Sequence, residues 1–369
     1  MIKIRAYADL HLFHDLNTMD DYINNELNDI INQMMTNKVD LIVFCGDLAH
    51  TTYQSSDRRF IEILNFVKRI VEVAEKTGTL IRIIQGTSSH DGKIVDILKL
   101  MFKDYSIIKC INKVKYEKIG DVVIRYLPEC YFATYSEFSA YAFSRLADIT
   151  FFHGSVEGVI PMLQQKDSVT NLPKSVVISR NDLLQKTTLF SAGGHIHKHI
   201  NLNGKIFYIN SLTAHNFSDV GDIKGYMEFE VNDDLSFKYK YIENFKGVKY
   251  IDIPIENINT KNKEEIRSLI SNLMLTYKPK DNIRFILTGI RNIEAMSNIA
   301  FIKSLTTKYN IKIKDKLEEP EIVNIIDEDS DYYIDKSISI VDKIYKILID
   351  TKHVTIDKKI IEDIILKGE

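Results

Sequence analysis

An apolar run followed by Gly and Asp stands out in the sequence, in Leu41-Ile42-Val43-Phe44-Cys45-Gly46-Asp47-Leu48-Ala49-His50. Its apolar run, residues 41–44, is too short for a helix and suits a buried strand. Gly46 lets the chain turn sharply at the strand end, and Asp47 comes directly after it. Open α/β sheets bind ligands at the carboxyl ends of their strands, so we expect the Asp47 carboxylate at such an edge. One strand-Gly-Asp sequence is a weak indication by itself, and its meaning depends on the residues at the ends of the neighbouring strands.

The sequence around this stretch predicts a series of alternating strands and helices. Strands are expected at 2–8 and 80–84, and amphipathic helices at 19–36 and 57–77 lie between the strands. This order of strand, helix, strand, helix and strand is a βαβ series. It predicts a parallel sheet over the first 90 residues.

The rest of the chain is richer in strands. We expect helices at 93–103 and 135–146, a hairpin over 112–126, strands at 149–152, 188–192, 205–210, 225–231 and 235–243, and a loop-rich segment at 155–186. A second unit begins near residue 248, with strands expected at 248–254, 283–288 and 310–314 and helices at 262–276 and 292–308. An acidic stretch around Pro320 indicates a linker, and two amphipathic helices come after it.

The composition is that of an ordinary globular protein, with 45% hydrophobic and 27% charged residues. No apolar run approaches the roughly 18 to 20 residues of a membrane span. Residues 1–5 lead straight into a strand, so no signal peptide is expected. The three cysteines have no CxxC spacing, which favours neither a disulfide framework nor a thiolate zinc site and fits a reducing cytoplasm. The net charge of −3 gives no global electrostatic case for nucleic-acid binding, so any such site must be a local patch.

Acidic and imidazole side chains gather just past the predicted strand ends. They are Asp9, His11, Asp47, His90, His153, His195 and His197. Each one alone is more often a solvated or capping loop residue. Together, carboxylate and imidazole ligands suit Mn, Fe or Zn, and two ions roughly 3.5–4 Å apart can clamp the attacking and leaving oxygens of a phosphoryl centre. Asp47, on what should be a central strand, is the natural bridge between two ions.

The order of these blocks resembles the calcineurin-like metallophosphoesterases. The matching blocks are Asp9-Leu10-His11, Gly46-Asp47, Gly86 to His90-Asp91, His153-Gly154 and Gly194-His195-Ile196-His197, in order over roughly 190 residues. Two features narrow the resemblance to the DNA-repair nucleases of the SbcD type, and within these to the phage-encoded recombination endonuclease subunits. One is Gly46 to His50, which is similar to Gly-Asp-Leu-x-His. The other is the block from Tyr208 to Tyr226, in which Ile209 and Asn210 stand where that group has Pro and Gly.

The resemblance implies an α/β fold, a calcineurin-like metallophosphoesterase β-sandwich flanked by helices, with a small α/β capping domain and C-terminal helices. It covers 1–250 by its motifs and the remainder only by architecture. The implied parts are a nuclease domain at 1–247, a capping and DNA-binding domain at 248–315, an acidic linker at 316–332 and C-terminal helices at 333–369. Basic residues of the capping domain would either contact phosphates or form an ordinary solvated surface.

The resemblance also implies the ligands of two Mn²⁺ ions, with Mg²⁺ or another divalent ion as the alternative. Metal one would be held by Asp9, His11, Asp47 and His197, and metal two by Asp47, His153, His195 and usually an Asn. The Asn is where this chain departs from the family, because Thr87-Ser88-Ser89 separates Gly86 from His90. Counted back from His90, Ser89 takes the Asn position. Its hydroxyl is a weaker ligand, so metal two would be looser or bound through a water.

The implied chemistry is hydrolysis of a phosphodiester by a metal-bound hydroxide. His90 is the candidate acid that protonates the leaving 3′-oxygen, and Asp91 would orient its ring. His50 would contact the scissile phosphate. The alternative for His50 is a residue at the start of a helix without a catalytic role.

The implied function is a Mn-dependent DNA nuclease subunit of an SbcCD-type complex in recombination, repair or replication. It would combine 3′-to-5′ exonuclease action on duplex ends with single-strand endonuclease action. Its expected partners are DNA, an SbcC-type coiled-coil ATPase bound by the C-terminal helices, and a second copy bound through the helices at 57–77 and 93–103. The expected location is the cytoplasm, that of the host if a phage encodes the chain, with no membrane association.

Two alternatives stay open. One is a calcineurin-like phosphodiesterase acting on a small phosphodiester such as a cyclic nucleotide. The tail helices and the block at 208–226 speak against it, since a small-molecule enzyme needs neither. The other is a catalytically weak scaffold on the same fold, against which the presence of seven expected acidic and imidazole residues speaks.

Overall fold

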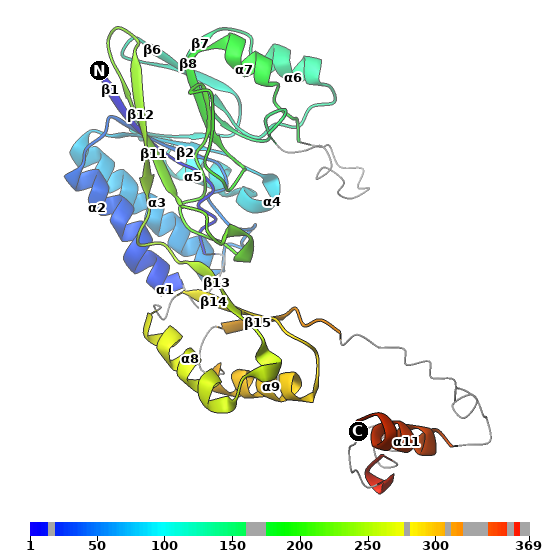
Figure 1. Cartoon of the computed structure of the whole chain (residues 1–369). Coiled ribbons are helices and arrows are strands. Elements are labelled where there is room, and N and C mark those ends of the chain that lie inside the picture. Colours follow the sequence, from blue (N-terminus) through cyan, green and yellow to red (C-terminus); the bar gives the residue numbers. More distant parts are fainter. Residues whose placement is uncertain are drawn as a thin grey trace. The chain divides into compact units, whose positions relative to one another are not determined.

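The described residues have a mixed α/β fold, in which they form three sheets with helices packed on them (Figure 1). The computed structural model describes residues 1–13, 19–159, 175–276, 281–306, 311–319, 339–352 and 358–361. The chain divides into two compact units, Met1–Leu317 and Glu318–Glu369.

The first sheet has six strands in the order β12-β11-β1-β2-β3-β4. They are β1 (Ile2–Tyr7), β2 (Leu41–Cys45), β3 (Leu80–Ile84), β4 (Ile108–Ile111), β11 (Gly225–Val231) and β12 (Phe237–Glu243). Strands β1 to β4 run parallel, and β11 and β12 extend the sheet antiparallel from β1. The predicted strands at 2–8, 41–44 and 80–84 and their parallel pairing are confirmed.

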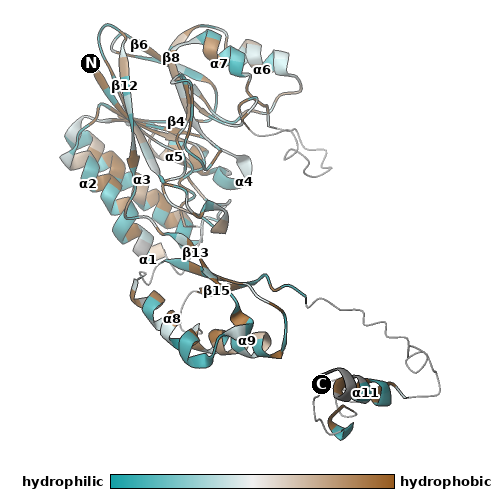
Figure 2. Ribbon diagram, in the orientation of Figure 1, coloured by the Kyte–Doolittle hydropathy of each residue, from teal (hydrophilic) through white to brown (hydrophobic). Residues whose placement is uncertain are grey.

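Helices cover one face of this sheet, as the βαβ pattern requires. Helix α1 (Met19–Tyr22), a π-helical turn (Ile23–Leu27) and α2 (Asn28–Thr36) run continuously between β1 and β2, α3 (Arg58–Thr77) joins β2 to β3, and α4 (Ser88–Asp91) and α5 (Ile94–Met101) join β3 to β4. Figure 2 shows apolar and polar residues alternating around α2 and α3. Ile63 and Val67 of α3 are buried against Ile42 and Ile81 of the sheet. Asp57 caps the start of α3, and its side chain accepts a hydrogen bond from the Arg59 amide.

The second sheet also has six strands, in the order β5-β6-β7-β8-β10-β9. They are β5 (Lys115–Ile119), β6 (Val122–Leu127), β7 (Ala147–His153), β8 (Thr187–Gly194), β9 (Ile200–Leu202) and β10 (Ile206–Tyr208), with α6 (Tyr135–Ala142) and α7 (Arg180–Lys186) along the chain between them. The predicted hairpin is present as β5 and β6. Strand β6 also pairs in parallel with β7, and the sequence pattern does not predict this pairing.

The two sheets pack face to face through one apolar core. Ile4, Ala6, Leu41 and Val43 of the first sheet meet Ile124, Tyr126, Ile149 and Phe151 of the second. Successive residues of a strand point to opposite faces of the sheet. Ala6 therefore faces the second sheet, while Tyr7 packs in the core under the helices. Hydrogen bonds from residues past β8 and at the end of β7 reach residues past β1 and at the end of β2. The carboxyl ends of the parallel strands in both sheets therefore meet at one edge.

Residues 248–315 form a three-stranded parallel sheet with its own core in the first unit. Its elements are β13 (Tyr250–Ile255), α8 (Lys263–Thr276), β14 (Asn282–Leu287), α9 (Ile293–Thr306) and β15 (Ile311–Asp315). The amide of Val248 donates to the Glu26 side chain (3.2 Å), which ties this region to the helix after β1. The predicted strands and helices of this region are confirmed at nearly their expected bounds.

The second unit contains α11 (Ile340–Lys352) and a helical turn at 358–361, joined by an ion pair between Lys358 and Asp342. Of the predicted acidic linker, residues 320–332 lie outside the described residues. Among the described helices, none has both the length and the apolar character needed to cross a membrane.

Candidate metal centre

Carboxylates and imidazoles from four parallel strands converge where the two sheets meet. Asp9 and His11 lie just past β1, Asp47 lies just past β2, His153 ends β7, and His195 and His197 lie just past β8. The ligand atoms of Asp9, His11 and His197 lie within 4.8 Å of one another, and so do those of Asp9, Asp47 and His153. His195 shares another such group with His153, so the structure brings together six of the predicted metal ligands.

The backbone at these residues is held in a conformation that side chains other than Gly rarely adopt. The φ angles are 47° at Asp9, 42° at His11, 49° at Asp47 and 95° at His195. Left-handed backbone at a non-glycine residue costs of order 1–3 kcal/mol and persists where the surroundings impose it, often at functional sites. The strain at these four residues supports a functional role for this edge of the sheets.

Two glycines allow the strand ends to approach closely. A Cβ on Gly46 would lie 2.2 Å from Nδ1 of His153, and one on Gly86 would lie 2.2 Å from the Asp47 amide nitrogen. Both distances are far inside van der Waals contact. Glycine at these positions therefore permits the contact between β2, β3 and β7 on which the site depends.

Hydrogen bonds orient the candidate ligands. The His195 amide donates to Oδ1 of Asp9 (2.8 Å), which joins the end of β8 to the end of β1. Nδ1 of His153 lies 2.8 Å from the Cys45 carbonyl oxygen, so this nitrogen carries the proton and donates. Nε2 of His153 is left facing Oδ2 of Asp47 at 3.3 Å. Such a bond to the second ring nitrogen is how proteins fix metal-ligating histidines.

The imidazole of His11 lies on the other side of Asp47. Its Nε2 is 3.7 Å from Oδ2 of Asp47 and 3.0 Å from Nε2 of His197. Asp47 is thus within 4 Å of a histidine of each group, His11 on one side and His153 on the other. The Asp47 carboxylate therefore lies between the two groups of candidate ligands.

The charges of the site favour a bound cation. Burial raises the pKa of Asp9 to about 7, although the charge of His153 opposes this. Burial also opposes ionisation of Asp47, but His153 and His11 outweigh it and hold the pKa of that carboxyl below its usual value. Burial disfavours the charged form of His153, yet Asp47 and Asp9 raise its pKa to about 10. Oδ2 of Asp9 is buried and, among the described residues, has no hydrogen-bond partner. Divalent cations fit this donor set and its charge.

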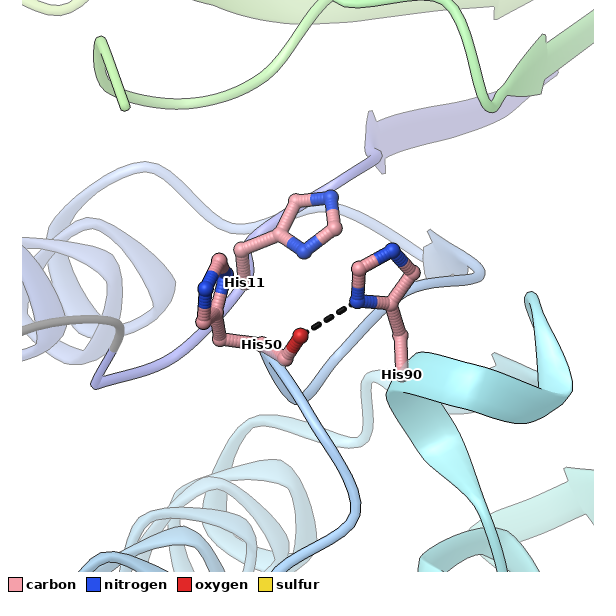
Figure 3. A group of neighbouring side chains, drawn as sticks. All are labelled: His11, His50 and His90. Atoms are coloured by element: carbon pink, nitrogen blue, oxygen red, sulfur yellow. Dashed lines mark hydrogen bonds between the residues drawn. The ribbon is translucent and has the colours of Figure 1, made fainter. Parts of the chain in front are cut away.

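His11, His50 and His90 form a third group of converging rings beside the carboxylates (Figure 3). The ring centroid of His11 is 4.5 Å from that of His90 and 5.6 Å from that of His50. Nδ1 of His90 is hydrogen-bonded to the backbone carbonyl of His50, as the dashed line shows. With Nδ1 as the donor, Nε2 of His90 is left for other partners.

The expected role of Asp91 is wrong. Its carboxylate does not orient the His90 ring, because it accepts from the amides of Gly86 (2.6 Å) and Ala49 (3.1 Å). The backbone carbonyl of His50 orients the ring instead. Asp91 holds together the two loops that carry Asp47 and Thr87.

Ser89 is not at the predicted ligand position. It is exposed on the short helix α4, and its backbone carbonyl accepts from Thr52. Thr87 lies at the site, with Oγ1 3.3 Å from Oδ2 of Asp47 and 3.4 Å from Nε2 of His153. If the position of the family's Asn is counted forward from Gly86, rather than back from His90, it falls on Thr87.

Two contributors to the site are absent from the sequence prediction. Glu129 lies just past β6, and its ligand atom lies within 4.8 Å of those of His153 and His195. Lys224, buried within the quoted block at 208–226, donates to the carbonyl of His197 (2.8 Å) and to Oδ1 of Asp219 (2.9 Å). The signal for Lys224 is that block itself. Glu129 could have been noticed as an acidic residue just past a predicted strand. The sequence pattern, however, places that strand only in a hairpin.

No protein-family model matches this chain, and no curated protein matches it. One crystal structure is similar at 12% identity over 65% of this chain and 98% of that chain, with a TM-score of 0.38. The glutamine-dependent NAD⁺ synthetase from Acinetobacter baumannii, in complex with adenosine diphosphate, is similar at 9% identity. That likeness covers 97% of this chain and 69% of that chain, with a TM-score of 0.33. Neither likeness bears on the function of this chain.

Proposed function

We propose that this chain has the calcineurin-like metallophosphoesterase fold and is the Mn-dependent DNA nuclease subunit of an SbcCD-type complex. The observation that carries the proposal is the position of Asp47. Its carboxylate lies between His11 and His153, at the edge where strands of both sheets bring further acidic and imidazole side chains. The motifs around Asp47 and at 208–226 support DNA as the substrate.

In this proposal the residues divide between two ions. Asp9, His11 and His197 would hold the first ion and His153 and His195 the second, and Asp47 would contribute to both. Bound divalent ions would supply Lewis-acid charge at the scissile phosphate and activate a water for attack on phosphorus.

His90 and His50 lie beside His11 and act on the substrate. The hydrogen bond from Nδ1 to the His50 carbonyl fixes the His90 ring and leaves Nε2 to deliver a proton to the leaving oxygen. The His50 side chain lies near the same position and would contact the phosphate.

The test compares three substrates with the purified full chain in Mn²⁺: a linear duplex, a single-stranded circle and a cyclic nucleotide. We expect cleavage of both DNA substrates. Asp47→Ala should lower the rate at least about a hundredfold, because both ions lose a shared ligand. Asp121→Ala, at an exposed aspartate in the turn between β5 and β6, is the matched control and should keep the wild-type rate.

Cleavage of the cyclic nucleotide alone would replace the proposal by a small-molecule phosphodiesterase. DNA cleavage that survives Asp47→Ala would contradict the assignment of the site. The C-terminal helices as an ATPase-binding element and a dimer formed through α3 and α5 belong to the same proposal.

A further inference from the structure

Glu129 brings a carboxylate to the centre from a strand that the predicted site does not include. It lies two residues past β6, which pairs in parallel with β7. Leu127 of β6 is opposite Phe152, the residue before His153. Because the carboxyl ends of β6 and β7 are adjacent, the Glu129 side chain starts from the same edge as His153.

The Glu129 side chain is buried, and one of its oxygens lacks an ordinary partner. The side chain is 2% exposed. Oε1 accepts a weak hydrogen bond from the Tyr131 hydroxyl (3.3 Å), whereas Oε2 is buried without a hydrogen-bond partner in the described part of the chain. Burial of a carboxylate oxygen without a hydrogen bond is costly, and the His153 ring, 4.0 Å away, is near enough to offset its charge but not to donate a hydrogen bond.

The distances around Oε2 suit a cation. Oε2 of Glu129 lies 4.0 Å from Nε2 of His153, too far for a hydrogen bond. An ion about 2.1 Å from each ligand atom fits between two atoms up to about 4.2 Å apart. His195 completes a group of three ligand atoms within 4.8 Å of one another.

We infer that Glu129 is a direct ligand of the second ion, together with His153, His195 and the shared Asp47. The inference rests on the proposed function, because it concerns one of the two ions of that site. It also accounts for the missing Asn, since Thr87 offers only a hydroxyl near His153 and Asp47. A carboxylate from a different strand supplies the ligand that the loop at 86–91 does not.

This ligand changes the charge of the site as well as its geometry. The three carboxylates of Asp9, Asp47 and Glu129 give the two ions one more negative charge than an amide ligand would. Anionic oxygen ligands favour hard divalent ions such as Mn²⁺ and Mg²⁺. The second ion is therefore expected to bind firmly despite the missing Asn.

The test is a Mn²⁺ titration of the chelator-treated full chain, monitored by calorimetry and by the electron paramagnetic resonance signal of free Mn²⁺. The wild type should bind two ions. Loss of an outer-shell partner costs roughly 10–100-fold in affinity, so loss of a direct ligand in Glu129→Ala should weaken the second ion by at least about that factor. Glu129→Gln, which keeps the shape and loses the charge, should weaken it about tenfold.

Two further variants separate a ligand from a structural residue. Glu157→Gln, at an exposed glutamate past β7, is the matched control and should leave both affinities within about twofold of the wild type. Adding Thr87→Asn to Glu129→Gln supplies an amide oxygen beside His153 and should restore most of the second-ion affinity. Circular dichroism of each metal-free variant shows whether it is folded.

The inference would be overturned if the wild type binds two ions and both Glu129 variants bind the second ion with unchanged affinity. That result would leave the proposed nuclease function intact. If binding of the second ion depends on Glu129 but the chain does not cleave DNA, the inference would be supported and the proposed nuclease function would be refuted. A wild-type chain that binds no Mn²⁺ would overturn both.

Discussion

The Asp91 carboxylate joins the loop after β2 to the loop after β3. Both of its oxygens accept from backbone amides, those of Ala49 and Gly86, and the residue is 2% exposed. Burial and the nearby charge of Asp47 raise the pKa of Asp91 to about 6. Because Gly86 also contacts the Asp47 backbone, Asp91 fixes the distance between the Asp47 loop and the Thr87 loop.

Asp91→Asn tests this structural role. The amide group offers one acceptor in place of two and turns an N–H₂ donor toward a backbone N–H. Leaving a buried donor unsatisfied costs about 1–3 kcal/mol, so the free energy of unfolding should fall by that amount. Urea unfolding of the metal-free chain measures it, with Asp121→Asn in an exposed turn as the control. An unchanged urea midpoint for Asp91→Asn would contradict the role.

The sequence predicts a site residue well where the end of a strand fixes the position of that residue. Asp9 and Asp47 lie just past strands and His153 ends one, each strand has a local pattern, and the structure brings the three residues together. The prediction of Ser89 is wrong because the loop at 86–91 can be aligned from either end, and only the fold of α4 shows which residue faces Asp47. Glu129 could not be predicted as a site residue, because its position depends on which strand pairs with β6 on the side away from β5.

Local sequence patterns predict the helices and strands well, whereas the pairing of distant strands is harder to predict. Helix α3 and strand β11 have the expected bounds to within a residue. The apolar periodicity and the capping residues that define such elements lie within or next to the segment itself. The parallel pairing of β6 with β7 and the short strand β4 are absent from the prediction. The β6–β7 pairing and the formation of β4 depend on contacts between segments that are distant in the sequence, and a local sequence pattern does not predict such contacts. Helix α7 is also absent from it, in the segment expected to be loop-rich.

Arg82 and Glu117 join the two sheets through a charged contact that the sequence does not indicate. Arg82 is on β3 of the first sheet and Glu117 is on β5 of the second. The guanidinium binds the carboxylate with two hydrogen bonds, 2.6 Å from Nε and 2.7 Å from Nη2. Burial disfavours the charged carboxylate, but hydrogen bonds from Arg82 and Lys109 outweigh it and lower the pKa of Glu117 to about 2.

Glu117→Gln should destabilise the protein in a way that depends on pH. A pKa lowered from 4.5 to about 2 corresponds to roughly 3 kcal/mol of folding free energy at neutral pH. Because the folded pKa lies below the unfolded one, this contribution is complete above about pH 5 and is lost as the pH falls toward 2. The difference in unfolding free energy between wild type and variant should therefore shrink from about pH 7 to about pH 3.

Denaturant unfolding at about pH 7, 5, 4 and 3 measures this difference, with Glu157→Gln as the exposed control. A constant difference across that range would show that the variant acts through packing rather than through the charge of Glu117.

The region of the three-stranded sheet offers less positive charge than its basic residues suggest. Arg284 binds Asp252 through two hydrogen bonds of 2.7 Å, and Arg291 pairs with Asp315 at 3.1 Å. Each arginine is thus neutralised by an aspartate of the same sheet. With a chain charge of −3, binding of DNA by electrostatics alone should be weak, and ions bound at the proposed metal centre should provide much of the attraction for a phosphate.

Exposed apolar side chains lie on two of the helices that cover the first sheet. Leu100 and Met101 at the end of α5 are 72% and 48% exposed, and Ile61 on α3 is 47% exposed. Scattered apolar residues are common on protein surfaces. These three lie on the two helices through which the resemblance implies a dimer, and they would bury apolar area there.

Leu100→Glu combined with Met101→Glu tests the dimer. Two carboxylates in a buried interface lose apolar burial and add the cost of desolvating charge, so the variant should be monomeric at concentrations where the wild type is a dimer. Light scattering after size-exclusion chromatography should give twice the mass of one chain for the wild type and a single mass for the variant. Leu184→Glu, at a leucine on α7 that is 45% exposed, should remain dimeric. Since α5 lies outside the metal centre, the variant should bind Mn²⁺ as the wild type does; a dimeric double variant would place the interface elsewhere.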